Sequence, residues 1–456
     1  MNFGVWHNGN TNLPLKETAE GIVVPDASLE EMHADRQRVL EERIEHGVLA
    51  DRRGYDRLTF TEHHFVLTGA EFSPNPLQTQ SVIAYNTERI KLRQVANILS
   101  WHDPVRIAEQ TAALDVISGG RAEVGIGRGY QSRENETFGQ YWGGGVADQE
   151  KNRASFEEKV EILLKAWTED VVSHHGQFHQ VPPTWARWHH PQERAYLADE
   201  VTEYAVGEFI DWHEGSVDET ALNPSYPDVV SGGASTLEAI SVFPQPVQDP
   251  HPQLWEPVGS PRSIRFAAEH GINPYLAGAR DPAQIDRIVE RYYEAVEAAG
   301  WPDHRPEYDG EPFARPWDES RQRGLTIYVP VFDTEVADED TYDRWLRGIK
   351  GYWQYIGFFG FAGGLPAVDD QHPIEHLRTL DPEVFVERDL YLAGDAEAIA
   401  DRLAHIAETL DAEEISFDLA FENMGITGQE ADAQLEAFAD RVAPYLEEEF
   451  PSAGDG

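Results

Sequence analysis

Short runs of apolar and β-branched residues alternate along this chain with longer segments in which apolar residues recur every three or four positions. The short runs predict strands, and the periodic segments between them predict helices. Eight strands are expected, at residues 2–7, 57–61, 90–99, 122–127, 253–258, 272–276, 325–332 and 414–421. Regular alternation of strands and helices is typical of a parallel α/β protein.

Two of the helices can be placed from local signals. Asp103 and Pro104 open the segment 103–118 as an N-cap and a first helical residue. The segment 28–50 carries apolar residues at spacings that favour one buried face, namely Leu29, Met32, Leu40, Ile44 and Val48.

Eight strands with intervening helices predict a (β/α)8 TIM barrel, for which about 250 residues suffice. The excess length falls in irregular segments near 180–250, 302–322 and 357–390. We interpret these segments as loop insertions in a single domain that covers residues 1–450, followed by a flexible tail at 451–456.

Charge changes this picture in one respect. The chain has 36 basic and 82 acidic residues, a formal net charge of −46. Such a charge repels phosphate backbones and anionic membranes, so we expect no binding to nucleic acid or to a membrane. At roughly 1 M salt the Debye length falls to about 3 Å and the self-repulsion largely disappears, which predicts a salt-adapted protein, as in a halophile.

Several features are missing from the sequence. It has no cysteine, which excludes disulfides and thiolate metal sites. The beginning, "MNFGVWHNGNTNLP", lacks the pattern of a signal peptide, and no apolar run approaches the ~18 residues of a membrane span. These observations predict a cytoplasmic location.

The stretch "GRAEVGIGRGYQ" (120–131) ends a strand in closely spaced glycines. It does not fit the nicotinamide fingerprint G-x-G-x-x-G, because Gly129 comes one residue too early. It fits a strand that ends at the functional rim of a barrel, where glycines let a flat ring approach the backbone. Arg128 could then meet an anion and Tyr130 an aromatic edge; the alternative is a turn that only closes the strand.

Two further stretches carry candidate chemistry. In "TFTEHHFV" (59–66), His63 ends the second strand and could move a proton near pH 7, although a structural histidine fits equally well. Alternation sends Glu62 and His64 to the other side, and we expect no metal site. In "WEPVGSPRSIRF" (255–266), a helix begins after Ser260, where free amides and hydroxyls suit a phosphate or an ordinary cap.

Taken in chain order, these stretches resemble bacterial luciferase-like flavin-dependent monooxygenases. The resemblance covers roughly 1–180, 240–300 and 323–447, and the block 102–139 is highly characteristic of that family. It implies a TIM barrel that binds reduced FMN at the carboxyl ends of its strands. In that family's light-emitting members a reactive cysteine stands where this chain has Gly127, so light emission is not expected.

The resemblance also implies roles for single residues. His63 corresponds to the catalytic histidine. Arg128 corresponds to the arginine that binds the flavin phosphate, in a turn completed by Gly129 and Tyr130. Ser260 and Ser263 correspond to the phosphate loop. The strand that lies beside the flavin, where the family often holds a cis peptide, maps to Val95, Ala96 and Asn97.

Three functions remain open from the sequence. The first is a monooxygenase that uses reduced FMN and O2 to oxidise a small organic substrate, supplied with reduced flavin by a separate reductase. The second is a deazaflavin-dependent oxidoreductase that transfers hydride without oxygen on the same barrel. The third is a flavin-binding protein without turnover. We also expect a homo-oligomer, namely a dimer.

Overall fold

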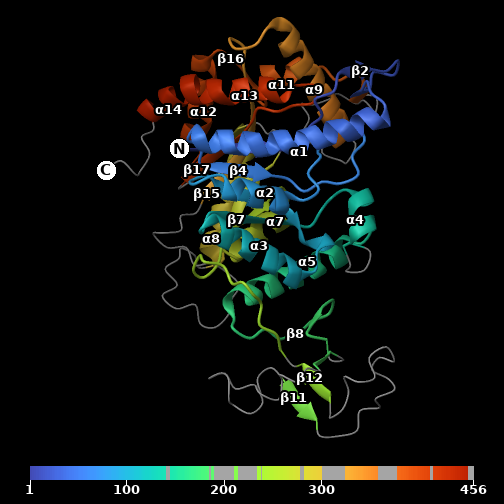
Figure 1. Ribbon diagram of the computed structural model, residues 1–456. Coiled ribbons are helices and arrows are strands. Elements are labelled where there is room, and N and C mark those ends of the chain that lie inside the picture. Colours follow the sequence, from blue (N-terminus) through green and yellow to red (C-terminus); the bar gives the residue numbers. More distant parts are fainter. Residues whose placement is uncertain are drawn as a thin grey trace.

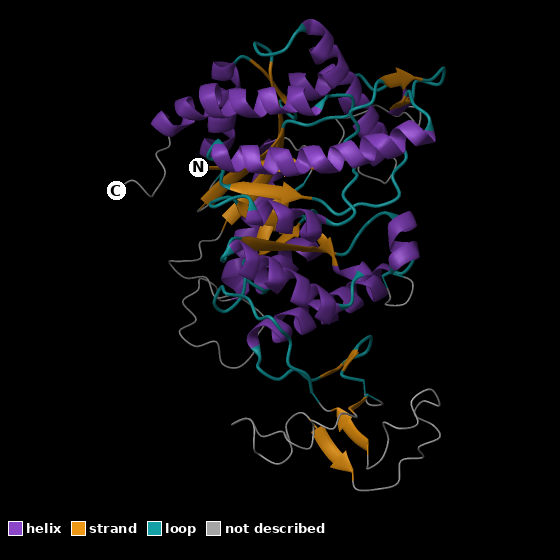
Figure 2. Ribbon diagram, in the orientation of Figure 1, coloured by secondary structure: helices purple, strands orange, loops and turns teal. Residues whose placement is uncertain are grey.

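A closed barrel of parallel strands forms the centre of the molecule (Figures 1 and 2). The computed structural model describes residues 1–139, 144–183, 186–188, 210–213, 234–237, 239–277, 282–299, 324–357, 377–410 and 414–449. The barrel strands are β1 (Asn2–His7), β4 (Arg57–Phe60), β5 (Lys91–Gln94), β7 (Ala122–Gly127), β13 (Leu254–Pro257), β14 (Asn273–Leu276), β15 (Gly324–Asp333) and β17 (Glu414–Ala420). Each pairs in parallel with the next along the chain, and β17 closes the ring on β1. The predicted (β/α)8 barrel is confirmed.

Helices surround this barrel (Figure 2). They are α1 (Leu29–Arg52), α2 (Pro76–Tyr85), α3 (Pro104–Ser118), α4 (Ser132–Phe138), α5 (Gln149–Thr168), α7 (Pro261–Glu269), α8 (Pro282–Ala299), α9 (Glu339–Gly357), α11 (Glu383–Glu387), α12 (Ala396–Thr409), α13 (Gly428–Ala437) and α14 (Ala443–Glu449). In Figure 1 the C-terminal helices lie beside α1, and α3, α5, α7 and α8 cover the opposite side. Asp103 caps α3 by accepting from the amides of Val105 and Arg106, as predicted.

Shorter strands lie outside the eight. They are β2 (Leu15–Glu17), β3 (Val23–Pro25), β6 (Asn97–Ile98), β8 (His174–His175), β9 (Gln180–Val181), β10 (Arg187–Trp188), β11 (Ile210–His213), β12 (Ala234–Leu237) and β16 (Leu392–Gly394). The predicted strand 90–99 is divided into β5 and β6, and the peptide bond between Val95 and Ala96, which lie between the two strands, is cis.

The expected buried face of α1 is only partly correct, because Met32, Ile44 and Val48 are half-buried whereas Leu29 and Leu40 are exposed. Leu29 is 60% exposed and Leu40 38% exposed. The buried side of α1 mixes apolar and polar residues, namely Asp35, Val39, Arg43, His46, Gly47 and Ala50. Arg43 donates to the carbonyl of Phe72 and to the Ser73 hydroxyl, and the His46 imidazole lies 2.9 Å from that of His7.

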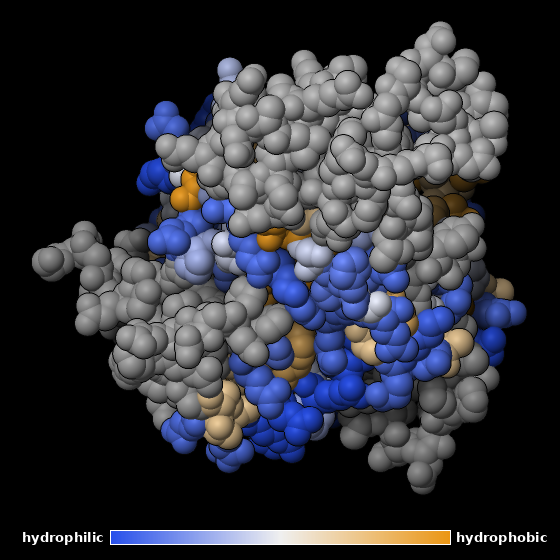
Figure 3. All heavy atoms as spheres, turned by 90° about the horizontal axis from the view of Figure 1, so that it is seen from below, coloured by the Kyte–Doolittle hydropathy of each residue, from blue (hydrophilic) through white to orange (hydrophobic). Residues whose placement is uncertain are grey.

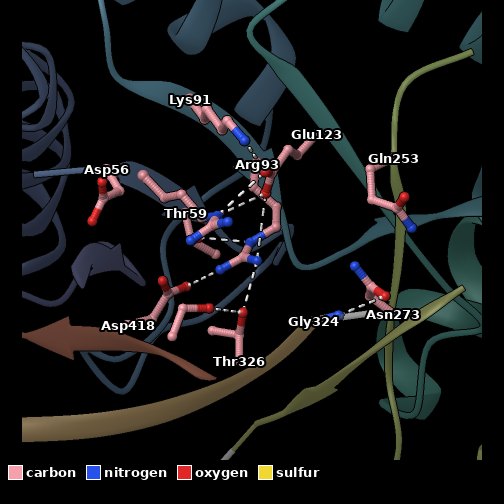
Figure 4. A network of polar contacts seen from close by, with 12 residues as sticks. Asp56, Thr59, Lys91, Arg93, Glu123, Gln253, Asn273, Gly324, Thr326 and Asp418 are labelled. Atoms are coloured by element: carbon pink, nitrogen blue, oxygen red, sulfur yellow. Dashed lines mark hydrogen bonds and ion pairs between the residues drawn. The ribbon is translucent and has the colours of Figure 1, made fainter. Parts of the chain in front are cut away.

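The barrel interior contains a charged layer rather than an aliphatic one (Figure 4). The Arg93 guanidinium, fully buried, donates to Asp418 at 2.8 Å and to Thr326 at 2.9 Å. Glu123 lies 3.5 Å from Arg93 and 3.1 Å from Arg57. Burial would raise the pKa of Glu123, but these cations and Lys91 lower it to about 2. The charges are therefore paired, as buried charges must be.

The expected insertions fall largely outside the described residues. Residues 302–322 and the tail 451–456 lie entirely outside them, as do most of 180–250 and half of 357–390. The described pieces of the first insertion include the antiparallel sheet β10–β12–β11, which lies apart from the barrel in Figure 1. At its base His174 is buried against Glu158 and Glu161, at 3.4 and 3.6 Å.

One face of the molecule can be seen in Figure 3. On the face seen in Figure 3, hydrophilic residues cover most of the described surface and hydrophobic ones are scattered among them. A search of the described helices for a segment long and apolar enough to cross a membrane finds none.

Candidate functional site

The carboxyl ends of the barrel strands carry the predicted site residues. Above the charged layer lies an aromatic layer: Trp6, Val95, Tyr275 and Ala420 form one buried cluster, with Tyr328 packed against it. His63, Asn97 and Arg128 follow the ends of β4, β5 and β7. The barrel therefore presents these residues at the edge where barrel enzymes place their active sites.

His63 lies between two carboxylates. Its Nε2 atom is 3.8 Å from Glu71 Oε1 and its Nδ1 atom is 3.6 Å from Glu134 Oε1. Burial alone would lower the pKa of His63, but the two carboxylates outweigh it and raise that pKa. The imidazole is thus favoured in its protonated form, which suits a proton donor.

Glu71 is held firmly in this position. Gln131 Nε2 donates to it at 3.0 Å, and the Tyr352 hydroxyl donates to it at 3.3 Å. Its backbone has a φ of 49°, unusual for a residue with a side chain, and the side chain is buried. Such backbone conformations are concentrated at functional sites.

Glu62 and His64 form a separate cluster, as alternation predicted. Glu62 accepts from the Ile98 amide at 2.7 Å and lies 2.8 Å from His102 Nε2. Burial would raise the pKa of Glu62, but His102 and its other donors lower it to about 2. Glu62 therefore anchors the end of β6, and His63 faces different partners.

The segment after β5 has the expected cis peptide, between Val95 and Ala96. Both residues are buried, and Val95 faces the aromatic layer. Asn97 donates through its amide to Gln94 Oε1 at 2.9 Å and to the Gly125 carbonyl at 3.0 Å. Asn97 thereby fixes the segment to β7.

Two glycines, one within β7 and one just after it, are required by close packing that the sequence did not reveal. A Cβ atom at Gly125 would collide with the carbonyl of Gln94, and one at Gly129 with the side chain of Asn135. Gly129 also has a φ of +73°. The chain's own atoms therefore explain these two glycines, while the approach of a flat ring to this backbone stays a prediction.

Tyr130 lies next to His63. Their ring centroids are 5.9 Å apart in an edge-on arrangement, and the Tyr130 hydroxyl accepts from Gln131 Nε2 at 2.9 Å. The structure thus brings together two site residues that are far apart in the sequence.

A cluster of arginines surrounds the beginning of α7. Arg128 donates to Asn152 at 3.1 Å, and its pKa is lowered by burial and then by the charges of Arg153 and Arg262. Ser260 caps α7: its hydroxyl accepts from the Ser263 amide at 3.1 Å, and the Ser263 hydroxyl accepts from the Ser260 amide at 3.1 Å. The ordinary capping function of these serines is confirmed, and it leaves the positive end of the helix beside three cations.

Two buried polar atoms in this cluster lack a hydrogen-bond partner among the described residues. They are Nη1 of Arg153, whose nearest carboxylate is Glu157 at 3.6 Å, and Oε2 of Glu256. Burial raises the pKa of Glu256 to about 8, although Arg153 and Arg128 oppose the rise. A neutral carboxyl group and an arginine with a free donor fit an anion with several acceptor oxygens, such as a phosphate.

Sequence reasoning missed Glu71, Glu134, Arg153 and Glu256. Glu134 and Glu256 stand inside stretches that the sequence singled out, but only their approach to His63 or Arg128 gives them a role. Glu71 and Arg153 are likewise identified by such contacts. Among the described residues, no group of three histidine or acidic side chains is arranged to hold a metal ion.

Residues 20–202 match the family model of the luciferase-like monooxygenases. An uncharacterised protein of Sinorhizobium fredii is 31% identical over 152 residues, which are 33% of this chain and 41% of that protein. The oxygenase component of flavin-dependent trigonelline monooxygenase from Acinetobacter baylyi is 23% identical over 263 residues, 58% of this chain and 55% of that protein. The chain spans about half the length of the curated relatives it matches.

Solved structures share the fold. The oxygenating constituent of 3,6-diketocamphane monooxygenase from Pseudomonas putida, in complex with FMN, superposes with a TM-score of 0.61 at 19% identity, covering 98% of both chains. An F420-dependent secondary alcohol dehydrogenase superposes with a TM-score of 0.56 at 12% identity, again over 98% of both chains. The same barrel thus serves flavin and deazaflavin enzymes.

Proposed function

We propose that this chain, whose residues 20–202 match the luciferase-like monooxygenase family model, is the oxygenase of a two-component system that uses reduced FMN and O2 to oxidise a small organic substrate. When bound, reduced FMN would provide the chemistry that activates O2. The protein would position the cofactor, exclude water and donate protons.

The cluster at the start of α7 carries this proposal. Arg128 and Arg153 offer positive charge, and the capped helix adds the positive end of its dipole. The third arginine, Arg262, is paired with Glu150 at 2.8 Å. The unpartnered Nη1 of Arg153 and Oε2 of Glu256 are buried in the same cluster. A phosphate group bound here would give both atoms a hydrogen-bond partner.

The remaining site residues fit the other end of the cofactor. The flavin ring would rest on Val95 and Ala96, above the aromatic layer and next to His63. His63, held between Glu71 and Glu134, would give up a proton during turnover. Asn97, Gly129 and Tyr130 would hold the two loops that frame the ring.

Electrons would arrive with free reduced flavin from a separate reductase, because the chain has no nicotinamide fingerprint. The trigonelline enzyme of Acinetobacter baylyi is likewise named as an oxygenase component. We further propose that the chain is a single domain with loop insertions, and that it forms a homodimer.

The decisive experiment compares cofactors in the presence of oxygen. The purified protein is titrated with FMN, riboflavin and the deazaflavin F420, and the bound cofactor is reduced and mixed with O2 in a stopped-flow instrument. We expect FMN to bind more tightly than riboflavin, and the reduced complex to be reoxidised by O2. Preference for F420 with an oxygen-insensitive reduced complex would identify the hydride-transferring alternative.

A further inference from the structure

Trp6 is a buried residue of the aromatic layer, and the described part of the chain offers its polar atom no hydrogen-bond acceptor. Its side chain is 6% exposed, and its indole Nε1 has no hydrogen-bond partner among the described residues. A buried donor without a partner costs about 1–3 kcal/mol. Native structures rarely contain such a donor unless a ligand or a water completes it.

The orientation of Trp6 is fixed from below. Its ring stacks on Tyr275 with a centroid distance of 5.5 Å and an interplanar angle of 25°. The Tyr275 hydroxyl donates to Asp418 Oδ2 at 2.9 Å, and the same oxygen accepts from Arg93 at 2.8 Å. Tyr275 is therefore fixed by a hydrogen bond to Asp418 in the charged layer of Figure 4, and Trp6 is oriented by stacking on Tyr275.

The neighbouring aromatic ring does not replace the missing acceptor. Tyr328 meets Trp6 edge-on, with centroids 5.0 Å apart. This contact offers at most a weak N–H···π interaction, which is a second-order effect. Val95 belongs to the same cluster as Trp6. A ring that rests on Val95 and Ala96 would therefore lie beside the cluster that contains Trp6.

From this arrangement we infer that the indole N–H of Trp6 is a hydrogen-bond donor to the flavin ring system, and that Trp6 is a cofactor-positioning residue. The acceptor is a carbonyl oxygen or a ring nitrogen, the only hydrogen-bonding atoms that a flavin ring offers to a donor. The inference rests on the proposed function, because it requires that a flavin occupies the barrel mouth.

The test is Trp6→Phe, which keeps an aromatic ring and removes the donor. The dissociation constants of FMN and riboflavin are measured by quenching of flavin fluorescence. We expect both to rise by a similar factor, about two- to tenfold, which is the loss of one neutral hydrogen bond. The unliganded variant should be no less stable than the wild type, since the unpartnered donor has been removed.

Trp255→Phe is the matched control. Trp255 is also buried with an unpartnered Nε1, but it lies in the charged layer, its ring 4.3 Å from the Arg93 guanidinium. We expect unchanged affinity for both flavins. The Trp6 indole ¹H–¹⁵N resonance, assigned by its loss in Trp6→Phe, should shift downfield when riboflavin is added to the wild type.

The outcomes separate this inference from the proposed function. A wild type that binds neither flavin would overturn both. Normal flavin binding with an unmoved indole resonance and unchanged affinities in Trp6→Phe would overturn the inference alone. Weaker binding of FMN but not of riboflavin would also overturn it, because the effect would then arise at the phosphate.

Discussion

His63 and Glu71 face each other at the mouth of the barrel, with His63 Nε2 3.8 Å from Glu71 Oε1. Glu71 is fixed by Gln131 and Tyr352, so the carboxylate is a permanent neighbour of the imidazole. This relationship decides how the site should respond to pH.

Replacement of His63 by alanine should leave the fold and flavin binding intact and slow turnover by about 10²–10⁴-fold, the usual contribution of a positioned acid or base. Because Glu71 helps to raise the pKa of His63, activity that needs the protonated imidazole should fall as pH rises through that pKa. In Glu71→Gln this fall should occur at lower pH. Stopped-flow reoxidation of the reduced complex across pH measures both effects, and an identical pH profile in Glu71→Gln would contradict the assigned role.

Replacement of Arg128 by alanine should weaken FMN binding by about 2–3 kcal/mol, the range for hydrogen bonds to charged groups. Riboflavin, which lacks the phosphate, should bind the variant and the wild type equally. Arg265→Ala removes an exposed arginine of α7 that pairs with Glu269 and serves as the control. Isothermal titration calorimetry measures the affinities; an unchanged FMN affinity would remove Arg128 from the site.

Glu256 should make stability depend on pH. Burial raises its pKa from 4.5 to about 8 in the folded protein. The folded state therefore retains a proton that the unfolded chain loses, and the resulting stability is lost as pH rises from about 4.5 to about 8. The slope is up to about 1.4 kcal/mol per pH unit for one group. Urea unfolding of Glu256→Gln should show a flatter dependence than the wild type in this window.

The affinity for FMN should also depend on the protonation state of Glu256. A neutral Glu256 donates a hydrogen bond to phosphate, whereas an ionised one repels it, so FMN affinity should decline above about pH 8. Glu256→Gln should abolish the decline, and riboflavin should not show it. Equal pH profiles for FMN and riboflavin would place Glu256 away from the phosphate.

The Arg93–Asp418 pair should be essential to the barrel. Asp418→Asn removes the nearer charged partner of the fully buried Arg93 guanidinium and leaves only Glu123, at 3.5 Å, which it shares with Arg57. Loss of a partner from a buried pair costs about 3–5 kcal/mol. Asp340→Asn breaks the exposed pair with Arg344 and should cost at most about 1 kcal/mol. Chemical denaturation of both variants compares them directly; similar small losses would show that the charged layer tolerates an unpaired arginine.

Salt should stabilise the protein. With a net charge of −46, the acidic side chains repel one another in the folded state, and dissolved salt screens that repulsion. The melting temperature should therefore rise between low and molar KCl. A flat dependence would contradict salt adaptation and would leave the proposed enzyme function untouched.

The sequence alone determined the features that depend on neighbouring residues. Strand periodicity gave the eight barrel strands, because each strand's pattern is local. Asp103 with Pro104, and Ser260 with Pro261, placed the starts of α3 and α7, because a cap is formed within one turn. The order of the strands around the barrel follows the chain order, so it too could be predicted.

Only the tertiary structure decided which residues meet. Glu134 reaches His63 from 71 positions away, and Arg153 and Glu256 reach Arg128 from other elements, so no spacing reveals them. The buried face of α1 and the reason for Gly129 depend on what packs against them, namely polar loops and Asn135. A sequence pattern shows only how residue types repeat along the chain. Burial and charge pairing depend on contacts between residues that are far apart in the sequence and come together only in the fold.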